Sequence, residues 1–386
     1  MKNKALWWVS LGTACCLFTG VGIGRFGYTV MVPAMVNAGL VSETEAGYLG
    51  AFNLLGYLLG SLAAPRLMRH FGSIPLLKAC MVVALVCLLV SAVPGGFWWL
   101  LPWRVLIGLA AGVLMVGAVT VLLTLASAEE LPTAAASLFT GVGTGIMLSG
   151  ILVPPLSGMG VAAAWLGLTA LVGIAIALAW WSFPARLPST DPGPSIQVRG
   201  TVLSAGVVRL LLAHLLFGMG IMPHTIYWVD YIARTLDRGM GTAGLSWTLV
   251  GIGAFVGPMI CGLLARNIGF SRGLVLAMAA LALGLLLPNM TGHAIAFILS
   301  SILFGVFNTG MSTLMSGRTR ELSEPATLAR VWGWMAIAIS VGQVIGGYAI
   351  VLLFEATSRI ESVFLFGTAV LVLGMLVSLD RGSKHS

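Results

Sequence analysis

Arg25 places a full positive charge inside the long apolar segment of residues 20–33. An arginine near the middle of a membrane helix costs between a few and more than about 10 kcal/mol, so it normally faces protein, water or substrate rather than lipid. Tyr28 follows on the same helical stripe, and three glycines form a neighbouring smooth face: Gly20, Gly24 and Gly27. We expect Arg25 and Tyr28 to face a cavity, where the guanidinium would bind an anionic group. The alternative is an Arg25 that ties helix carbonyls together or extends towards the membrane surface.

A second group of polar side chains lies in residues 218–231. Pro223 removes a backbone donor and predicts a kink in the helix. His224, Tyr227 and Tyr231 form one stripe beyond it. Histidine has an unperturbed pKa of about 6.5 and changes charge near neutrality. We therefore expect this stripe to bind substrate, with His224 also coupling protons; the alternative is a histidine that hydrogen-bonds between helices.

Asp230 is the acid closest in sequence to this stripe and is a second candidate for proton coupling. It can face Arg25 across the bundle or pair with Arg234 one helical turn later. Asn308 and Gln343 are amides inside apolar segments. We expect them to line the cavity, with interhelical hydrogen bonds as the alternative.

The composition predicts that membrane-spanning helices position these residues. The chain is 59% hydrophobic and 8% charged, with a mean hydropathy of +1.03, and apolar runs of 18 or more residues recur along it. The chain is therefore an all-α integral membrane protein, and we read its first apolar run as a retained helix. We predict twelve transmembrane helices, starting near Trp7, Glu45, Ile74, Phe97, Pro132, Val161, Val202, Gly241, Gly273, His293, Ala326 and Ser362.

The basic residues outside the spans predict the topology. If the N-terminus is cytoplasmic, the outer segments hold three of them, Arg234, Arg238 and Arg359, and the inner segments hold fifteen. Basic residues resist translocation, so this bias places both termini in the cytoplasm. That arrangement requires an even number of spans, as the count of twelve provides. The net charge of +8 is thus topological and does not indicate nucleic-acid binding.

The two halves of the chain repeat each other. A shift of 197 residues superposes, among others, Gly56, Gly60, Arg69 and Gly72 on Gly253, Gly257, Arg266 and Gly269. Shifts of 198 and 192 align glycines of the first and fifth spans with those of the seventh and eleventh. We predict an N-terminal six-helix bundle (residues 1–184), a cytoplasmic linker (185–200) and a C-terminal six-helix bundle (201–386).

Three stretches resemble motifs of the major facilitator superfamily (MFS). The loop after the second span, with Gly60, Arg66, Arg69 and Gly72, resembles its inner-loop signature, although the signature's acid is missing. Arg104 and Gly108 resemble its Arg-x-x-x-Gly helix, which favours a place for Arg104 in the bundle over one at the membrane surface. The fifth span resembles a motif of antiporter members and carries Gly141, Gly150, Pro154 and Pro155. We expect the proline pair to interrupt that helix near its outer end.

The phrases around Arg25 and Gly150 resemble the YbfB/YjiJ-like bacterial branch of that superfamily. The resemblance implies two pseudo-symmetric bundles around a central cavity that opens alternately to each side of the cytoplasmic (inner) membrane. It also implies gating or structural roles for Gly60, Arg66, Arg69, Gly72, Arg104, Gly150, Pro154 and Pro155. No phosphate-binding loop, metal-site spacing or nucleophile motif points to an enzyme, and no cofactor is expected.

The sequence thus predicts a secondary transporter that moves a small organic solute by alternating access, coupled to protons. The fifth-span motif favours export by antiport. Arg25 favours the alternative of organic-anion uptake by proton symport. A third alternative is a copper importer that uses methionine and histidine of the seventh span: Met219, Met222 and His224, with Met31 and Met35. The expected partners are the solute, protons and the lipid bilayer, and we expect a monomer.

Overall fold

The structure is a computed structural model that describes residues 2–125, 131–184, 204–324 and 327–379. Every regular element in these ranges is a helix. In chain order they are α1 (Lys2–Leu17), the π-helix η1 (Phe18–Phe26), α2 (Gly27–Asn37), α3 (Glu43–Phe71), α4 (Ser73–Ser91), α5 (Gly96–Leu125), α6 (Leu131–Ser157), α7 (Val161–Ser182), α8 (Ala205–Gly220), α9 (Met222–Asp230), the π-helix η2 (Tyr231–Thr235), α10 (Gly239–Ile268), α11 (Phe270–Met290), α12 (Ala294–Leu322), α13 (Leu328–Thr357) and α14 (Ile360–Ser378).

These helices form twelve segments long and apolar enough to cross a membrane, which confirms the predicted number. Two of the segments are irregular. The first, Leu6–Asn37, combines α1, η1 and α2, and the seventh, Ala205–Thr235, combines α8, α9 and η2. A π-helical turn inside an α-helix is rare and often occurs at functional sites. Both irregular segments carry the polar residues that the sequence singles out.

The break in the seventh segment lies beside Pro223, as the sequence predicts. α8 ends at Gly220, Ile221 forms a turn, and α9 starts at Met222. Proline tolerates the first turn of a helix because its missing N–H would have no helical partner there. Its ring lies close to α14, where a Cβ added to Gly367 would be 2.7 Å from Pro223 Cγ.

The chain divides into two compact units. Unit 1 comprises Met1–Asp191 with Thr225–Phe255, and unit 2 comprises Pro192–His224 with Val256–Ser386. The predicted linker, residues 185–200, lies outside the described residues. The boundaries expected from the internal repeat stay a prediction.

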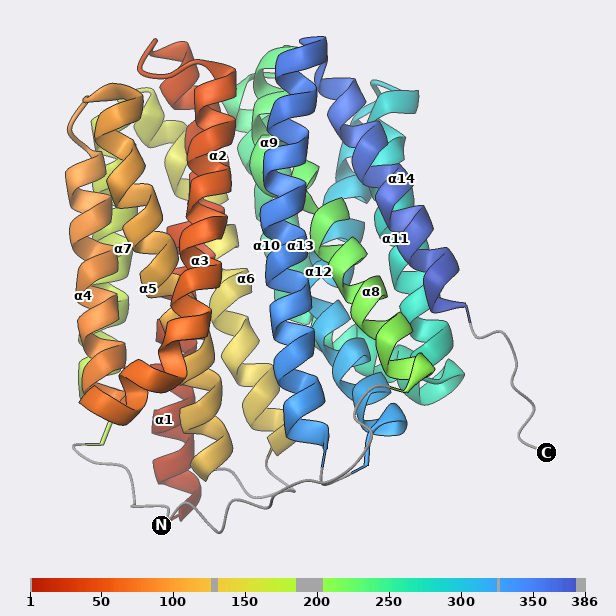
Figure 1. The fold of residues 1–386 in the computed structure, drawn as a ribbon. Coiled ribbons are helices and arrows are strands. Elements are labelled where there is room, and N and C mark those ends of the chain that lie inside the picture. The colour runs from red at the N-terminus through yellow and green to blue at the C-terminus, as the bar shows by residue number, and fades with distance from the viewer. Residues whose placement is uncertain (1, 126–130, 185–203, 325–326, 380–386) are drawn as a thin grey trace. The chain divides into compact units, whose positions relative to one another are not determined.

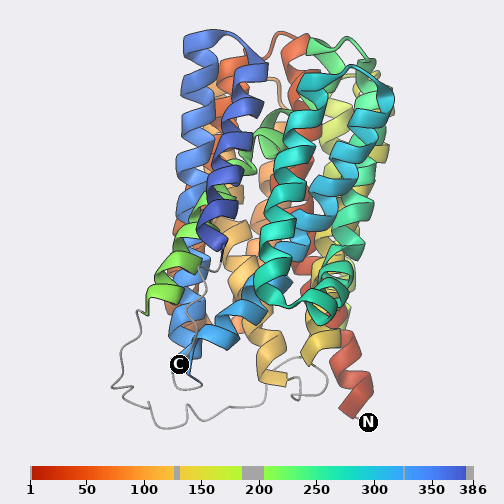
Figure 2. The same cartoon turned by 90° about the vertical axis from the view of Figure 1, so that its right-hand side faces the viewer.

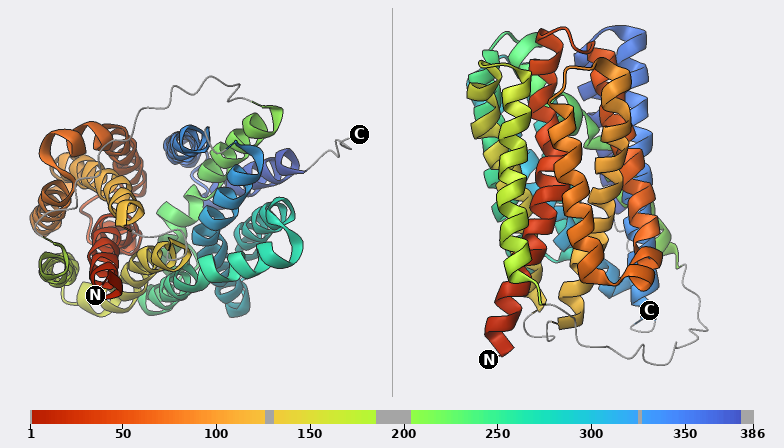
Figure 3. Two further views of the ribbon diagram at one scale, coloured as in Figure 1. Left: turned by 90° about the horizontal axis from the view of Figure 1, so that it is seen from below. Right: turned by 90° about the vertical axis from the view of Figure 1, so that its left-hand side faces the viewer.

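In unit 1, glycines allow α3 and α5 to pack backbone against backbone. A Cβ added to Gly60 would lie 2.0 Å from Leu109 O, and one added to Gly108 would lie 2.2 Å from Asn53 O. Since real Cβ atoms do not approach this closely, only glycine fits. Within this unit α4 also packs against α5 and α7, and α1 against α6 and α7 (Figures 1 and 3).

In unit 2, α8 packs against α13 and α14, and α11 packs against α12 and α14 (Figure 2). A Cβ added to Gly257 of α10 would lie 2.2 Å from Val306 O of α12. Gly257 is 197 positions after Gly60, and Val306 is 197 positions after Leu109. Each unit therefore contains the same close crossing at the offset read from the sequence.

The first and fifth spans repeat their contact at a different offset. A Cβ added to Gly141 would lie 2.1 Å from Ala14 O, and one added to Gly342 would lie 2.1 Å from Leu215 O. Gly342 is 201 positions after Gly141, and Leu215 is 201 positions after Ala14. The helix packing thus makes Gly342 the equivalent of Gly141, whereas the sequence shift of 192 makes it the equivalent of Gly150.

Candidate functional site

Arg25 lies in η1 and is buried, with 7% of its surface exposed. Its Cζ lies 5.1 Å from the centre of the Phe26 ring and 5.4 Å from that of Tyr57 in α3. These distances are within the range of cation–π attraction. Aromatic rings of unit 1 therefore cover Arg25, and its side chain does not extend to the membrane surface.

Arg104 of α5 is also inside unit 1, with 2% of its surface exposed. Its Nη1 donates to Gly24 O in η1 at 3.1 Å, and its Cζ lies 4.0 Å from the centre of the Tyr28 ring. Asn53 Nδ2 holds the backbone by donating to Arg104 O at 2.9 Å. Arg104 thus belongs to the bundle, as the family resemblance implies, and the surface alternative is wrong.

Tyr28 is the platform on which Arg104 lies. Its hydroxyl donates to Ala46 O of α3 at 2.8 Å, which fixes the ring against a second helix. Only 2% of Tyr28 is exposed. We call the two arginines and their aromatic neighbours in unit 1 the arginine site. All of them are buried except Tyr57, which is half-buried: Arg25, Phe26, Tyr28, Tyr57 and Arg104.

Asp230 is the only acidic side chain that is buried in the described part of the chain. Its Oδ1 lies 3.3 Å from Arg234 Nη1, so the local partner, and not Arg25, forms its ion pair. Arg234 Nη2 also lies 2.7 Å from Glu43 Oε1, and its Nε donates to Asn37 Oδ1 at 3.0 Å. All four residues belong to unit 1, and we call them the Arg234 cluster.

Local structure at the start of α3 positions Glu43. Ser42 and Glu45 form a capping box, with Ser42 N donating to Glu45 Oε2 at 2.8 Å and Glu45 N to Ser42 Oγ at 3.2 Å. The cap fixes the first helical turn, from which the Glu43 carboxylate reaches Arg234. The cap is local, whereas Arg234 lies 191 positions after Glu43 in the chain.

His224 lies in unit 2, in an aromatic environment. Its ring stacks on Phe304 at 4.5 Å between centroids and meets Phe364 edge-on at 5.6 Å. Its Nε2 lies 2.8 Å from Ser300 Oγ, and the Ser300 hydroxyl donates to Gly284 O at 2.6 Å. Because that hydroxyl uses its hydrogen on Gly284, Ser300 Oγ accepts from His224 Nε2–H. His224 thus connects α9 to α12 and α11.

The stripe expected from His224 to Tyr231 is divided between the two units. Tyr227 and Tyr231 are buried in unit 1, where 0% and 2% of their surfaces are exposed. The hydroxyl of Thr29 in α2 donates to Thr225 O and joins this segment to the first span. The other two predicted cavity residues, Gln343 of α13 and Asn308 of α12, lie in unit 2, buried and half-buried respectively. Substrate binding by these residues stays a prediction.

The predicted gating residues on α3 have two different environments. Gly60 is packed against α5, whereas Arg66 and Arg69 are exposed near the end of the helix. Gly72 ends α3 with a φ of 79°, a backbone conformation that residues other than glycine rarely adopt. The structure thus gives a conformational reason for the final glycine of the motif.

The proline pair of the fifth span does not interrupt its helix, and this expectation is wrong. α6 continues through Pro154 and Pro155 to Ser157. Both prolines lie within the last turn, so few helical residues follow them and the rest of the helix keeps its hydrogen bonds. A Cβ added to Gly150 would lie 2.7 Å from Gly244 O, so α6 packs closely against the first half of α10 within unit 1.

Sequence reasoning missed Tyr57, Glu43 and Trp247. Trp247 of α10 is fully buried, its ring lies 6.2 Å from that of Phe26, and its Nε1 has no hydrogen-bond partner among the described residues. An indole inside an apolar segment resembles ordinary packing, so the sequence contains no signal that marks it.

The copper alternative gains no support, since the described residues contain no cluster of three His, Cys, Asp or Glu side chains that could hold a metal ion.

Comparison of the sequence with known proteins found a matching family and a related protein. The sequence model of a family described as "Uncharacterised MFS-type transporter YbfB" matches residues 17–379. A curated relative from Haemophilus influenzae, named "Putative metabolite transport protein", is 22% identical over 98% of this chain and 96% of its own length.

Solved structures resemble the whole chain in fold. A point mutant of the nucleoside transporter NupG has a TM-score of 0.78 at 13% identity, over 96% of this chain and 98% of its own. A POT family transporter in complex with 5-aminolevulinic acid has a TM-score of 0.76 at 12% identity, over 97% of this chain and 95% of its own. At such identities the likeness concerns the fold alone.

Proposed function

Since this chain belongs to the MFS-type transporter family whose members resemble YbfB, we propose that it moves a small organic anion across the membrane and binds it at the arginine site. The family and the twelve apolar helices of the described residues make the chain a multi-pass membrane protein of the MFS transporter type. Its family and its relatives are transporters and not enzymes.

The buried guanidinium of Arg104 is the observation that carries the anion proposal. It contacts a carbonyl oxygen and a tyrosine ring, both neutral, and no acidic side chain in the described ranges lies within ion-pair distance of it. Burying a charge without an opposite charge costs several kcal/mol. An anionic substrate would offset this cost on binding. Arg25 adds a second positive charge to the same group of residues.

One donor of the buried Arg104 side chain has no partner among the described residues. A guanidinium carries five N–H donors in one plane, and the Arg104 Cζ lies 4.0 Å from the centre of the Tyr28 ring. Nη1 donates to Gly24, and Nε has no hydrogen-bond partner among the described residues. A carboxylate or similar planar anion would accept from this donor. Trp247 Nε1 offers a further donor in unit 1.

We propose that Asp230 couples transport to protons. Its carboxylate is buried and ion-paired with Arg234, which also contacts Glu43 and Asn37. Protonation would remove the charge of Asp230 and break the ion pair inside the Arg234 cluster. An inside-negative potential of 100 mV opposes entry of one negative charge by about 2.3 kcal/mol, and a co-transported proton removes that charge. Uptake by proton symport is therefore the direction that anion binding favours.

Export by proton antiport is the second candidate function. The observation that favours it is the glycine contact between α6 and α10, where a Cβ added to Gly251 would lie 2.3 Å from Met147 N. Such a close, smooth contact supports the mechanical role that the antiporter-like motif implies for α6. Solute efflux driven by an inward proton gradient would support this alternative over uptake.

We propose that the protein lies in the bacterial inner membrane as a monomer. Both termini would lie in the cytoplasm, because fifteen basic residues against three then lie on the inner side. We also propose two repeated six-helix bundles joined by residues 185–200. The identical glycine crossings at Gly60 and Gly257 support the repeat.

A ligand screen of the purified protein tests the anion proposal. We expect small organic anions to raise the melting temperature by mass action, whereas cationic and neutral amphiphiles leave it unchanged. The anion effect should be lost in Arg104→Gln and kept in Arg272→Gln, a matched exposed arginine of unit 2. Stabilisation by cationic or neutral compounds alone would refute anion binding and favour a drug-type exporter.

A further inference from the structure

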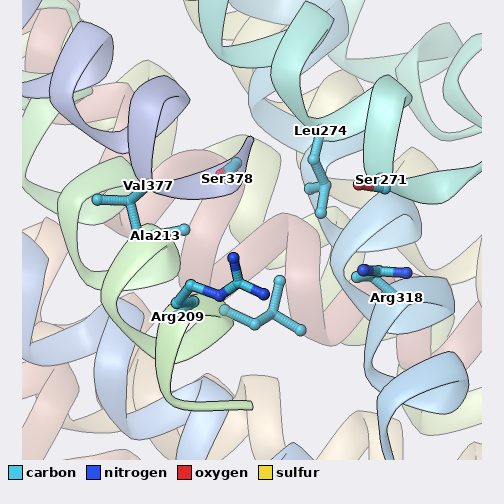
Figure 4. A pocket seen from close by; sticks show the side chains of 8 residues that line it. Arg209, Ala213, Ser271, Leu274, Arg318, Val377 and Ser378 are labelled. Atoms are coloured by element: carbon cyan, nitrogen blue, oxygen red, sulfur yellow. The ribbon is translucent and has the colours of Figure 1, made fainter. Parts of the chain in front are cut away.

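A pocket at one end of unit 2 brings two arginines together with two serines. Its lining comes from the N-terminal parts of α8 and α11 and the C-terminal parts of α12 and α14, and consists of Arg209, Leu210, Ala213, Ser271, Leu274, Arg318, Val377 and Ser378 (Figure 4). The pocket is half-open, and its cavity volume is small, about 20 Å³. This pocket is separate from the arginine site, which belongs to unit 1.

The charges in this pocket are positive. The lining residues contain no acid. Arg209 is half-buried, and its guanidinium extends into the space between α8 and α12 (Figure 4). Arg318 has 19% of its side chain exposed and pairs with Glu321 outside the lining, Nη1 to Oε2 at 2.7 Å. Exposed pairs of this kind contribute about 0 to 1 kcal/mol, so Glu321 does little to hold Arg318 away from an anion.

The start of α11 also favours an anion here. Ser271 lies in the first turn of α11, which starts after Gly269 (φ 84°), and the positive end of the helix dipole attracts anions. The hydroxyl of Ser378 donates to Gly374 O at 2.8 Å, so its hydrogen is not available to a ligand. Arg209 and Arg318 both line the pocket, and guanidinium groups form charge-assisted hydrogen bonds with phosphate oxygens.

The remaining lining is apolar. Leu210, Ala213 and Leu274 are buried, and Val377 lies beside them on α14. A pocket with basic side chains on one side and aliphatic side chains on the other matches a phosphate attached to a hydrocarbon. Moreover, this end of the helices is the one that the distribution of basic residues assigns to the cytoplasmic leaflet, whose anionic lipids attract basic groups.

We propose that this pocket binds a phosphate group, carried by an anionic membrane lipid or present as free phosphate. The site does not depend on the proposed transport function. It would stabilise unit 2 by joining α8, α11 and α12 through one ligand. The two sources share their recognition chemistry and differ in whether a hydrocarbon chain lies against Leu210 and Leu274.

The test measures thermal unfolding of the full chain in phosphatidylcholine nanodiscs with and without phosphatidylglycerol, and separately in detergent with and without inorganic phosphate. We expect phosphatidylglycerol to raise the melting temperature by several degrees. The rise should be lost in the double variant Arg209→Gln/Arg318→Gln. It should remain in the matched control Arg272→Gln, an exposed arginine beside Ser271 that is not part of the lining.

The result with inorganic phosphate distinguishes a phosphate carried by a lipid from free phosphate. Stabilisation by phosphatidylglycerol alone assigns the site to lipid, and an equal rise with inorganic phosphate assigns it to the free ion. An unchanged rise in the double variant, or none with either ligand, overturns the proposal. If the double variant does not fold, native mass spectrometry of the wild-type protein from mixed lipid decides: preferential retention of phosphatidylglycerol that Arg209→Lys reduces supports the site, and equal retention of both lipids refutes it.

Discussion

The guanidinium of Arg104 lies 4.0 Å from the centre of the Tyr28 ring, although 76 positions separate the two residues in the chain. Tyr28 itself is fixed to Ala46 by a hydrogen bond of 2.8 Å. The first span, α3 and α5 therefore hold one positive charge in a defined orientation inside unit 1. This arrangement makes the arginine site testable, because the charge, the ring and the hydroxyl can each be removed separately.

Replacing Arg104 by lysine keeps the charge and removes the planar set of donors. We expect anion affinity to fall about tenfold or more, a loss of roughly 1.4 kcal/mol per factor of ten. Ligand-dependent thermal shift measures this directly, and transport in vesicles shows whether the Michaelis constant rises in parallel. Wild-type affinity in Arg104→Lys would show that Arg104 does not bind the substrate.

Replacing Tyr28 by phenylalanine keeps the ring under Arg104 and removes the hydrogen bond to Ala46. The expected cost is about 1 kcal/mol of stability, because one buried carbonyl loses its donor. Transport should be largely retained. In Tyr28→Leu, by contrast, the cation–π contact is lost as well, and we expect a further drop in both melting temperature and transport. Equal behaviour of the two variants would contradict a role for the ring.

Replacing Asp230 by asparagine removes the proton-binding carboxylate from the Arg234 cluster. We expect exchange of substrate between the two sides of a vesicle to persist while accumulation driven by a proton gradient disappears. Glu43→Gln is the matched control, since it removes the other, more exposed acid that contacts Arg234. Gradient-driven accumulation that survives in Asp230→Asn would exclude Asp230 as the coupling residue.

His224 is the other residue expected to couple protons, and its contacts allow a comparison. Ser300→Ala removes the acceptor of His224 Nε2–H but leaves the imidazole in place. If His224 couples protons, His224→Gln should abolish accumulation and keep exchange. If it only joins helices, His224→Gln and Ser300→Ala should both lower the melting temperature and leave accumulation intact. Vesicle assays with both variants separate these outcomes.

The close crossing of α3 and α5 predicts an unusually sensitive glycine. Gly60→Ala should destabilise the protein by about 1 to 3 kcal/mol or more, because the added Cβ overlaps a backbone carbonyl and the helices must separate. Gly173→Ala is the control, because nothing lies within 4 Å of the added Cβ and alanine favours the helix by about 0.5 to 1 kcal/mol. Similar melting temperatures for the two variants would contradict this packing.

The sequence by itself determined the class of the protein and its local features. Apolar runs longer than a bilayer is thick permit only membrane helices here, so the twelve spans could be predicted. The break beside Pro223 followed from a missing backbone donor, and the spacing of one helical turn offered Arg234 as one of two partners for Asp230. Each of these depends on residues that are neighbours along the chain.

Only the tertiary structure decided which distant residues meet. Arg104 with Gly24, and Glu43 with Arg234, are pairs that packing brings together. His224 and Tyr231, expected on one stripe, both lie beyond the turn at Ile221 but belong to different compact units. The helices that surround each residue, and not its place on its own helix, decide its neighbours. Burial of Arg104 was decided in the same way, since no local pattern states which neighbours will cover a charge.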